Sequence, residues 1–180
     1  MIYIFLADGF EEIEALTPVD VFRRAGLDTV TVSISDSYTV IGSHNIAVAA
    51  DKLLSEVDLA DADLLLLPGG MPGARHLGAC TPLRDAVSAH AGAGKPVAAI
   101  CAAPSVLGAL GLLRGKEAIC YPGFEDALIG ATISEKKVVR DGNIVTAAGM
   151  GVALDFALEC LCLLGRDSDA ARIRTSVIAE

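Results

Sequence analysis

The sequence contains no tryptophan and few other aromatic residues, with five phenylalanines and three tyrosines among 180 residues. It also lacks an excess of positive charge, because 23 acidic residues outnumber 14 Lys and Arg residues and leave a formal net charge of −9. Such a chain, without a basic stripe interleaved with aromatics, would be repelled by phosphate backbones. We therefore set nucleic acid aside as a direct ligand.

Long hydrophobic runs are also missing from the chain. The apolar runs at residues 64–67 and 157–164 are shorter than a membrane span, and Glu159 interrupts the second. Residues 1–7 are apolar from the start and lack the basic segment and the cleavage site of a signal peptide. We expect no membrane partner and read these first residues as a β-strand.

Cysteine is present in an odd number, five, with no regular framework spacing. In a chain of this size that pattern indicates reduced thiols and a cytoplasmic location instead of a disulfide scaffold. Histidine is scarce, and no spacing of His, Cys and carboxylate residues typical of a metal site stands out. No metal or cofactor is expected.

The composition is otherwise that of a packed globular protein, with 53% hydrophobic and 21% charged residues. No repeat, low-complexity tract or linker rich in Pro, Gly and Ser divides the chain. We therefore expect a single domain covering residues 1–180.

Short apolar runs alternate with helical stretches, which predicts an α/β fold with a mainly parallel sheet covered on both faces. A hairpin is expected within residues 38–48, and a tight turn between two strands at 141–143. The expected strands are 2–7, 29–34, 64–67, 97–100 and 144–147, and the expected helices are 12–24, 82–91, 105–110, 152–164 and 168–178.

Three of these strands end in unusual sequence, and ligands of open α/β sheets bind at the carboxyl ends of strands. After the first strand, a helix begins with three acidic residues, Glu11, Glu12 and Glu14. The helix dipole explains acids in the first turn. That account serves Glu11 and Glu12 well, whereas Glu14 needs a further reason.

The second unusual end is Pro68-Gly69-Gly70. Without side chains, the backbone N–H groups of such a segment can approach a bound oxygen and form an oxyanion hole. The alternative is that the glycines only permit a tight turn.

The third end carries Cys101 between an apolar strand and the small residues Ala102 and Ala103. This arrangement resembles a nucleophile elbow, in which a sharp turn exposes the nucleophile and aims the next N–H group at the substrate oxygen. A helix N-terminus would also lower the pKa of the thiol from about 8.5 into the range of roughly 3.5–7.5. The alternative is a buried structural cysteine.

Taken in this order, the motifs Gly9-Phe10-Glu11-Glu12-Ile13-Glu14, Pro68-Gly69-Gly70 and Ala99-Ile100-Cys101-Ala102-Ala103-Pro104 resemble the ThiJ/PfpI superfamily, in particular its DJ-1 branch. The resemblance covers nearly the whole chain. It implies a flavodoxin-like three-layer sandwich, a homodimer, and a thiolate at Cys101 that is hydrogen-bonded to a protonated Glu14.

Two positions depart from the pattern of that branch. Tyr121 stands where relatives carry a histidine near the cysteine, and Ala148 stands where relatives can carry an arginine. The resemblance therefore implies a catalytic pair, Cys101 and Glu14, without help from an imidazole. The oxyanion and substrate-binding residues are expected to be Gly69, Gly70, Ala102 and Tyr121.

The expected function is cofactor-independent conversion of α-oxoaldehydes, such as methylglyoxal to lactate, or removal of early glycation products, so the partners are small aldehydes or glycated substrates. The alternative from another class is a redox-sensing stress protein or chaperone that uses an oxidisable Cys101. A cysteine peptidase or amidase is disfavoured, because Ala102 replaces the histidine that follows the cysteine in that branch, and His44, His76 and His90 form no triad motif.

The resemblance also implies an interface between two copies of the chain. The first helix would contribute Val19, Phe22 and Arg23 across a two-fold axis, with Arg24 and His44 nearby.

Overall fold

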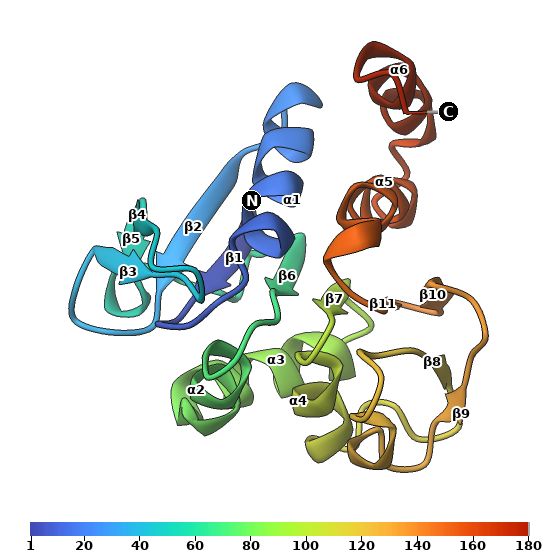
Figure 1. Ribbon diagram of the computed structural model, residues 1–180, viewed down its shortest axis with the longest axis horizontal. Helices are drawn as coiled ribbons and strands as arrows, with labels where there is room; N and C mark the ends of the chain where they lie inside the picture. The colour runs from blue at the N-terminus through green and yellow to red at the C-terminus, as the bar shows by residue number, and fades with distance from the viewer. Residues whose placement is uncertain (180) are drawn as a thin grey trace.

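The computed structural model describes residues 1–179. Its centre is a seven-stranded sheet with the strand order β10-β11-β7-β6-β1-β2-β5 (Figure 1). All neighbouring strands in this sheet run parallel except the antiparallel pair β10 and β11. The sheet strands are β1 (Ile2–Leu6), β2 (Thr29–Ser33), β5 (Lys52–Leu53), β6 (Leu64–Leu67), β7 (Val97–Ile100), β10 (Val138–Asp141) and β11 (Ile144–Ala147).

Six α-helices and two small two-stranded sheets complete the described part of the chain. The helices are α1 (Glu12–Arg24), α2 (Gly73–Ala79), α3 (Thr81–Gly92), α4 (Pro104–Ala109), α5 (Ala153–Leu163) and α6 (Asp167–Ser176). The small sheets pair β3 (Thr39–Ile41) with β4 (Ala47–Ala49) and β8 (Glu117–Ala118) with β9 (Thr132–Ile133). Single 3₁₀ turns lie at Leu54–Glu56, Glu125–Ala127 and Met150–Val152.

The three layers follow from the alternation of side chains along the buried strands. In β1, Ile4 packs in a cluster with Phe22 of α1 and Phe156 of α5, whereas Phe5 packs on the other face with Leu83 of α3. Figure 1 shows α1, α5 and α6 on one face of the sheet and α2, α3 and α4 on the other. Burying each such side chain contributes roughly 1.5–3 kcal/mol. The flavodoxin-like three-layer sandwich is thus confirmed.

The five predicted strands and five predicted helices are all present, with ends that differ by at most two residues. The hairpin expected at 38–48 is the antiparallel pair β3 and β4. Helix α2 escaped prediction because two of its seven residues, Gly73 and Gly78, have low helix propensity. Strands β5, β8 and β9 were also missed, because two-residue strands carry no alternation to read.

The expected role of Val19 and Phe22 at an interface between copies is wrong. Both side chains are buried in the core, with 8% and 0% of their surface exposed. The outward face of α1 instead presents Ile13 and Leu16, which are 45% and 37% exposed.

Within residues 1–179, none of the helices combines the length and the apolar character that a membrane crossing requires. The carboxyl ends of β1, β6 and β7, which are neighbours in the sheet, point to the same edge. The segments that follow them therefore meet, which brings Glu14, Gly70 and Cys101 together.

Candidate active site

Cys101 occupies the sharp turn between β7 and α4. Its φ is +64°, in the left-handed region that costs a non-glycine residue about 1–2 kcal/mol. Two hydrogen bonds hold this conformation: the Cys101 N–H donates to the Ala147 carbonyl at 2.8 Å, and the Cys101 carbonyl accepts from the Tyr121 N–H at 2.8 Å. The structure thus shows the strained turn of a nucleophile elbow, with a half-buried thiol.

The N–H groups of Gly70 and Ala102 both donate to the Cys101 sulfur. Gly70 has φ +84°, and a Cβ there would lie 2.3 Å from the backbone nitrogen of Glu11. Glycine is therefore required at position 70. The two N–H groups expected to form an oxyanion hole therefore lie beside the Cys101 sulfur, where they can donate to an oxygen on a carbon bonded to that sulfur.

Glu14 lies in the first turn of α1, the helix that follows β1, and its side chain reaches the sulfur at the carboxyl ends of the strands. Its side chain is 1% exposed, and one carboxyl oxygen accepts a hydrogen bond from the Gly69 N–H at 3.0 Å. Glu14 also bonds the Cys101 side chain and the Met150 N–H. The further reason for an acid at position 14 is this contact with the cysteine.

Gly69 itself does not line the cavity around Cys101. Its N–H is engaged by Glu14, so the expectation that Gly69 binds a substrate oxygen is corrected to a positioning role. A Cβ at position 69 would lie 2.5 Å from the Glu14 carboxyl oxygen and 2.7 Å from the Cys101 Cβ. Only glycine lets these two side chains meet.

Burial controls the protonation of the pair. It raises the pKa of Glu14 to about 7, although hydrogen bonds from Cys101 and Gly69 oppose the rise. Burial, followed by the charge of Glu14, raises the pKa of the Cys101 thiol to about 12. The predicted lowering of the Cys101 pKa is therefore wrong, because α4 has only six residues and its N-terminus does not outweigh burial and a neighbouring carboxylate.

The two groups are best treated as one titrating unit. Glu14 has the lower pKa of the two groups, because the pKa of the thiol is raised further by burial and by the charge of Glu14. Once Glu14 is ionised, the carboxylate can take the thiol proton as the sulfur attacks.

A cavity of about 320 Å³ opens above the pair. Cys101, Glu14, Gly70, Ala102 and Tyr121 all line it, which places five of the six predicted site residues around one space. The Tyr121 ring is 51% exposed and forms part of the wall. A larger cavity of about 470 Å³ lies against α3, away from Cys101, and contains no cysteine.

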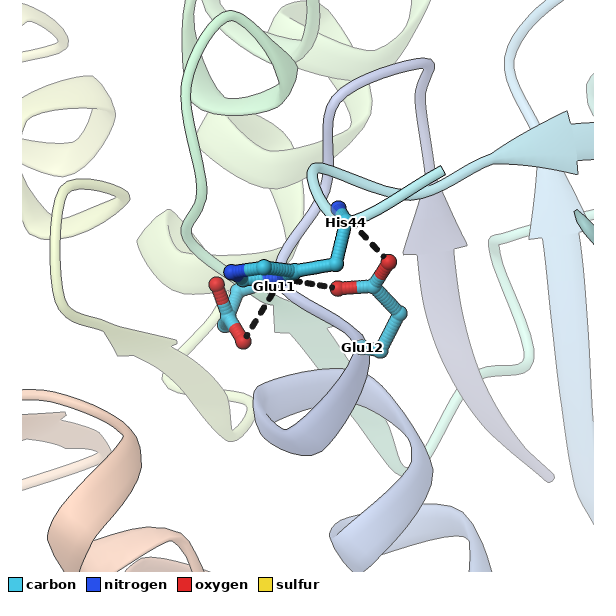
Figure 2. Close-up of side chains that lie close together, drawn as sticks. All are labelled: Glu11, Glu12 and His44. Atoms are coloured by element: carbon cyan, nitrogen blue, oxygen red, sulfur yellow. Dashed lines mark hydrogen bonds and ion pairs between the residues drawn. The ribbon is translucent and has the colours of Figure 1, made fainter. Parts of the chain in front are cut away.

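His44 also lines the cavity around Cys101, which the sequence did not reveal. It lies in the turn between β3 and β4, and the buried Glu12 carboxylate accepts hydrogen bonds from its backbone N–H and its Nδ1, both at 2.9 Å (Figure 2). The His44 Nδ1 is 3.7 Å from a Glu11 oxygen. No sequence signal links these residues, because 32 positions separate His44 from Glu12.

The charges of this cluster are complementary. Burial opposes the ionisation of Glu12, but the hydrogen bonds from the His44 side chain and the backbone lower its pKa to about 2. The hydrogen bond to Glu12, together with the charge of Glu11, raises the pKa of His44 above 6.5. Glu12 is therefore an anion at neutral pH, and His44 is stabilised as a cation.

Glu11, Glu12 and His44 are also the residues that could hold a metal ion, since their ligand atoms lie within 4.8 Å of one another. The spacing along the sequence did not indicate this group, because 32 positions separate His44 from Glu12. Imidazolium and carboxylate satisfy each other in this cluster, so its geometry is explained by hydrogen bonds and ion pairs alone.

The remaining cysteines lie outside the cavity. Cys160 is fully buried in the core between α5 and the sheet, as expected for a packing residue. Cys120 is 1% exposed, and burial raises its pKa to about 11. Neither has the elbow geometry of Cys101.

Comparison with known proteins gives consistent matches over this whole architecture. A model of the DJ-1/PfpI family matches residues 1–163. The Parkinson disease protein 7 homolog of Danio rerio is 32% identical over 181 residues, which covers 98% of this chain and 96% of the relative. The solved structure of oxidized Toxoplasma gondii DJ-1 is 36% identical, with a TM-score of 0.94 over 98% of this chain and 97% of that chain.

A longer plant protein also matches. Protein DJ-1 homolog B of Arabidopsis thaliana is 40% identical over 169 residues, which covers 92% of this chain but 39% of the relative. The chain thus spans about two fifths of the length of that relative.

Proposed function

The chain belongs to the DJ-1/PfpI family, and from its Cys101–Glu14 pair we propose that it is a cofactor-independent cysteine enzyme that converts α-oxoaldehydes into hydroxy acids. The observation that carries the proposal is the hydrogen bond between a buried carboxyl group with a pKa of about 7 and a thiol on a strained turn. Such a group is poised to move protons at neutral pH.

The first step is addition of sulfur to the aldehyde carbon of a substrate such as methylglyoxal. The S–H proton passes to Glu14 as the C–S bond forms, and the carbonyl π electrons move to oxygen. The N–H groups of Gly70 and Ala102 stabilise that oxygen, because both already point at the sulfur. Glu14 then returns the proton to the oxygen and gives a hemithioacetal.

The second step moves the hydrogen on C1 to C2. The Glu14 carboxylate removes the C1 proton, which leaves an enediolate with negative charge on the C2 oxygen, and then delivers this proton to C2. The proton of the C1 hydroxyl passes to the C2 oxygen as the C1 carbonyl forms, which leaves a thioester on Cys101. Water attacks this thioester, the sulfur leaves, and the hydroxy acid is released. The sum is methylglyoxal plus water to lactate plus a proton, without net oxidation.

Hemithioacetals and aminocarbinols on proteins release the free aldehyde when the bond to the protein sulfur or nitrogen breaks and that atom takes up the hydroxyl proton. Conversion of the released aldehyde by the same pair would therefore also remove early glycation products. In both cases Tyr121 forms a wall of the cavity, and Gly69 positions Glu14. We place the activity in the cytoplasm, because all five cysteines are free thiols.

The test is turnover of methylglyoxal, followed by lactate formation, with wild type, Cys101→Ser and Cys80→Ser. Cys80 is half-buried and lies outside the cavity, so it serves as the matched control. We expect turnover by wild type and Cys80→Ser, and a loss of more than about 10³-fold in Cys101→Ser. Absence of turnover in folded wild-type protein would reject the proposal.

A second candidate function is redox sensing through Cys101. One structural relative is described as oxidized, and the N–H groups around the Cys101 sulfur would stabilise added oxygen atoms. Peroxide treatment followed by mass spectrometry should then locate two added oxygens at Cys101. If peroxide oxidises Cys101 and wild type does not turn over methylglyoxal, this function replaces the first.

We further propose that two copies of the chain associate through the outward face of α1. The support is the pair of exposed apolar side chains Ile13 and Leu16, one helical turn apart. Light scattering should give the mass of a dimer at micromolar concentration, and Leu16→Asp should give monomers. A wild-type monomer at that concentration would contradict the proposal.

A further inference from the structure

The Cys101 cavity contains a histidine that the steps above do not use. His44 and Glu11 line the same cavity as Cys101, and 65% of the His44 side chain is exposed. The ring is not a freely rotating surface group, because Glu12 holds both its backbone N–H and its Nδ1 at 2.9 Å. A ring anchored at Nδ1 presents its Nε2 in a fixed direction, which Figure 2 shows pointing away from Glu12.

The chemistry of the second step leaves one atom without a partner. When the C1 proton is removed, negative charge develops on the C2 oxygen. The Gly70 and Ala102 N–H groups lie at the sulfur and therefore beside the C1 oxygen. Glu14 is occupied with the carbon-bound proton. A proton donor on the cavity wall would stabilise the charge on the C2 oxygen.

We propose that His44, held by Glu12, is a catalytic acid that protonates the C2 oxygen of the substrate; this inference rests on the proposed conversion of α-oxoaldehydes. The Nε2 proton moves to the C2 oxygen as the C1–H electrons form the C1–C2 double bond. After Glu14 has delivered its proton to C2, the neutral imidazole accepts the proton of the C1 hydroxyl as the thioester carbonyl forms. His44 is then a cation again, and the proton count is unchanged.

The charges that face the ring favour its acid form. Glu12 of α1 and Glu11 at its N-terminus both lie next to Nδ1, and Glu14 and Cys101 share the cavity. The buried Glu12 is the nearest of these partners and acts as the orienting carboxylate of a carboxylate–histidine dyad. These negative charges raise the pKa of His44, so the imidazolium persists to higher pH than in a free histidine.

The test compares wild type with His44→Gln, Glu12→Gln and the control His76→Gln, whose exposed ring lies outside the cavity. We expect His44→Gln to lower kcat/KM for methylglyoxal by about 10²-fold or more. The decrease of kcat/KM at alkaline pH, caused by loss of the His44 proton, should disappear in that variant. In Glu12→Gln the decrease should move to lower pH, because the carboxylate that stabilises the cation is gone.

Cys101 alkylation at fixed pH shows whether the elbow is intact, and it should be similar in wild type, His44→Gln and His76→Gln. If wild type turns over methylglyoxal and His44→Gln has the same rate or the same pH profile, the role of His44 is overturned. The proposed function then stays in place. Absence of turnover in wild type would reject the proposed function itself, and this inference with it.

Discussion

The Glu14 carboxyl group lies against the Cys101 thiol, joined by a hydrogen bond in which the acid is 1% exposed. Both partners lose solvation there, so both are harder to ionise than in water. At neutral pH the carboxyl and thiol groups consequently hold one proton between them. A thiol and a carboxyl group that can accept its proton thus lie side by side.

The first prediction concerns proton transfer by Glu14. We expect kcat/KM for methylglyoxal to rise with pH through about 7, where the pair loses its first proton. Glu14→Gln keeps the size of the side chain but cannot carry the proton, so turnover should fall by about 10²–10⁴-fold. Glu14→Asp should also be impaired, because its shorter side chain withdraws the acid. Near-wild-type turnover in Glu14→Gln, with circular dichroism showing a folded protein, would remove the shuttle role.

The second prediction concerns stability. The pKa of Glu14 rises from 4.5 to about 7 in the folded protein, so the native state binds more protons than the unfolded state between these values. Each pKa unit corresponds to about 1.4 kcal/mol, so the contribution of Glu14 should fall by roughly 3 kcal/mol as pH rises through that window. It is fully present below about pH 4.5.

Urea unfolding at several pH values between about 5 and 8 tests this. Glu14→Gln should lose most of this pH dependence and be more stable than wild type at pH 8. The control Glu135→Gln removes an exposed carboxylate and should follow the wild-type curve. Parallel curves for wild type and Glu14→Gln would show that burial does not raise the Glu14 pKa.

The third prediction concerns Gly69. In Gly69→Ala the new Cβ would meet the Glu14 carboxyl, the Cys101 Cβ and the Ile100 carbonyl oxygen at 2.5, 2.7 and 2.9 Å. We expect a loss of about 1–3 kcal/mol in the free energy of unfolding, together with most of the activity.

Gly92→Ala is the matched control, because it lies at the end of α3 and a Cβ there meets nothing within 4 Å. It should be neutral or up to about 1 kcal/mol more stable, as is usual for Gly to Ala in a helix. Equal stability and activity of the two variants would mean that the approach of the Glu14 and Cys101 side chains to Gly69 affects neither property.

The fourth prediction tests the strain at Cys101. At an ordinary position, alanine is more stabilising than glycine by about 0.4–1 kcal/mol. At φ +64° the order should be reversed or cancelled, because the left-handed conformation costs alanine about 1–2 kcal/mol. Urea unfolding of Cys101→Gly and Cys101→Ala gives the comparison directly. A normal advantage for alanine would show that the elbow relaxes when the thiol is removed.

Much of the fold could be predicted from the sequence, because most helices and strands of this chain have recognisable local sequence patterns. Strands such as β6 and β7 are short runs of consecutive apolar residues, and α1 begins at its cluster of acids and ends before Gly26. The elbow at Cys101 could likewise be predicted, since small residues at a strand-to-helix junction permit the sharp turn of a nucleophile elbow. Helix α2 could not be predicted, because its glycines have low helix propensity.

What the sequence by itself determined is the set of segments and the candidate nucleophile and acid, because these depend on neighbours along the chain. The tertiary structure decided what those groups experience. Burial and the charge of Glu14 reversed the expected direction of the Cys101 pKa. In the fold, the Gly69 N–H donates a hydrogen bond to Glu14. The fold also brings His44, from a turn distant in sequence, into a hydrogen bond with Glu12 at the cavity wall. Solvation and long-range contact set these properties, and neither is encoded in a local pattern.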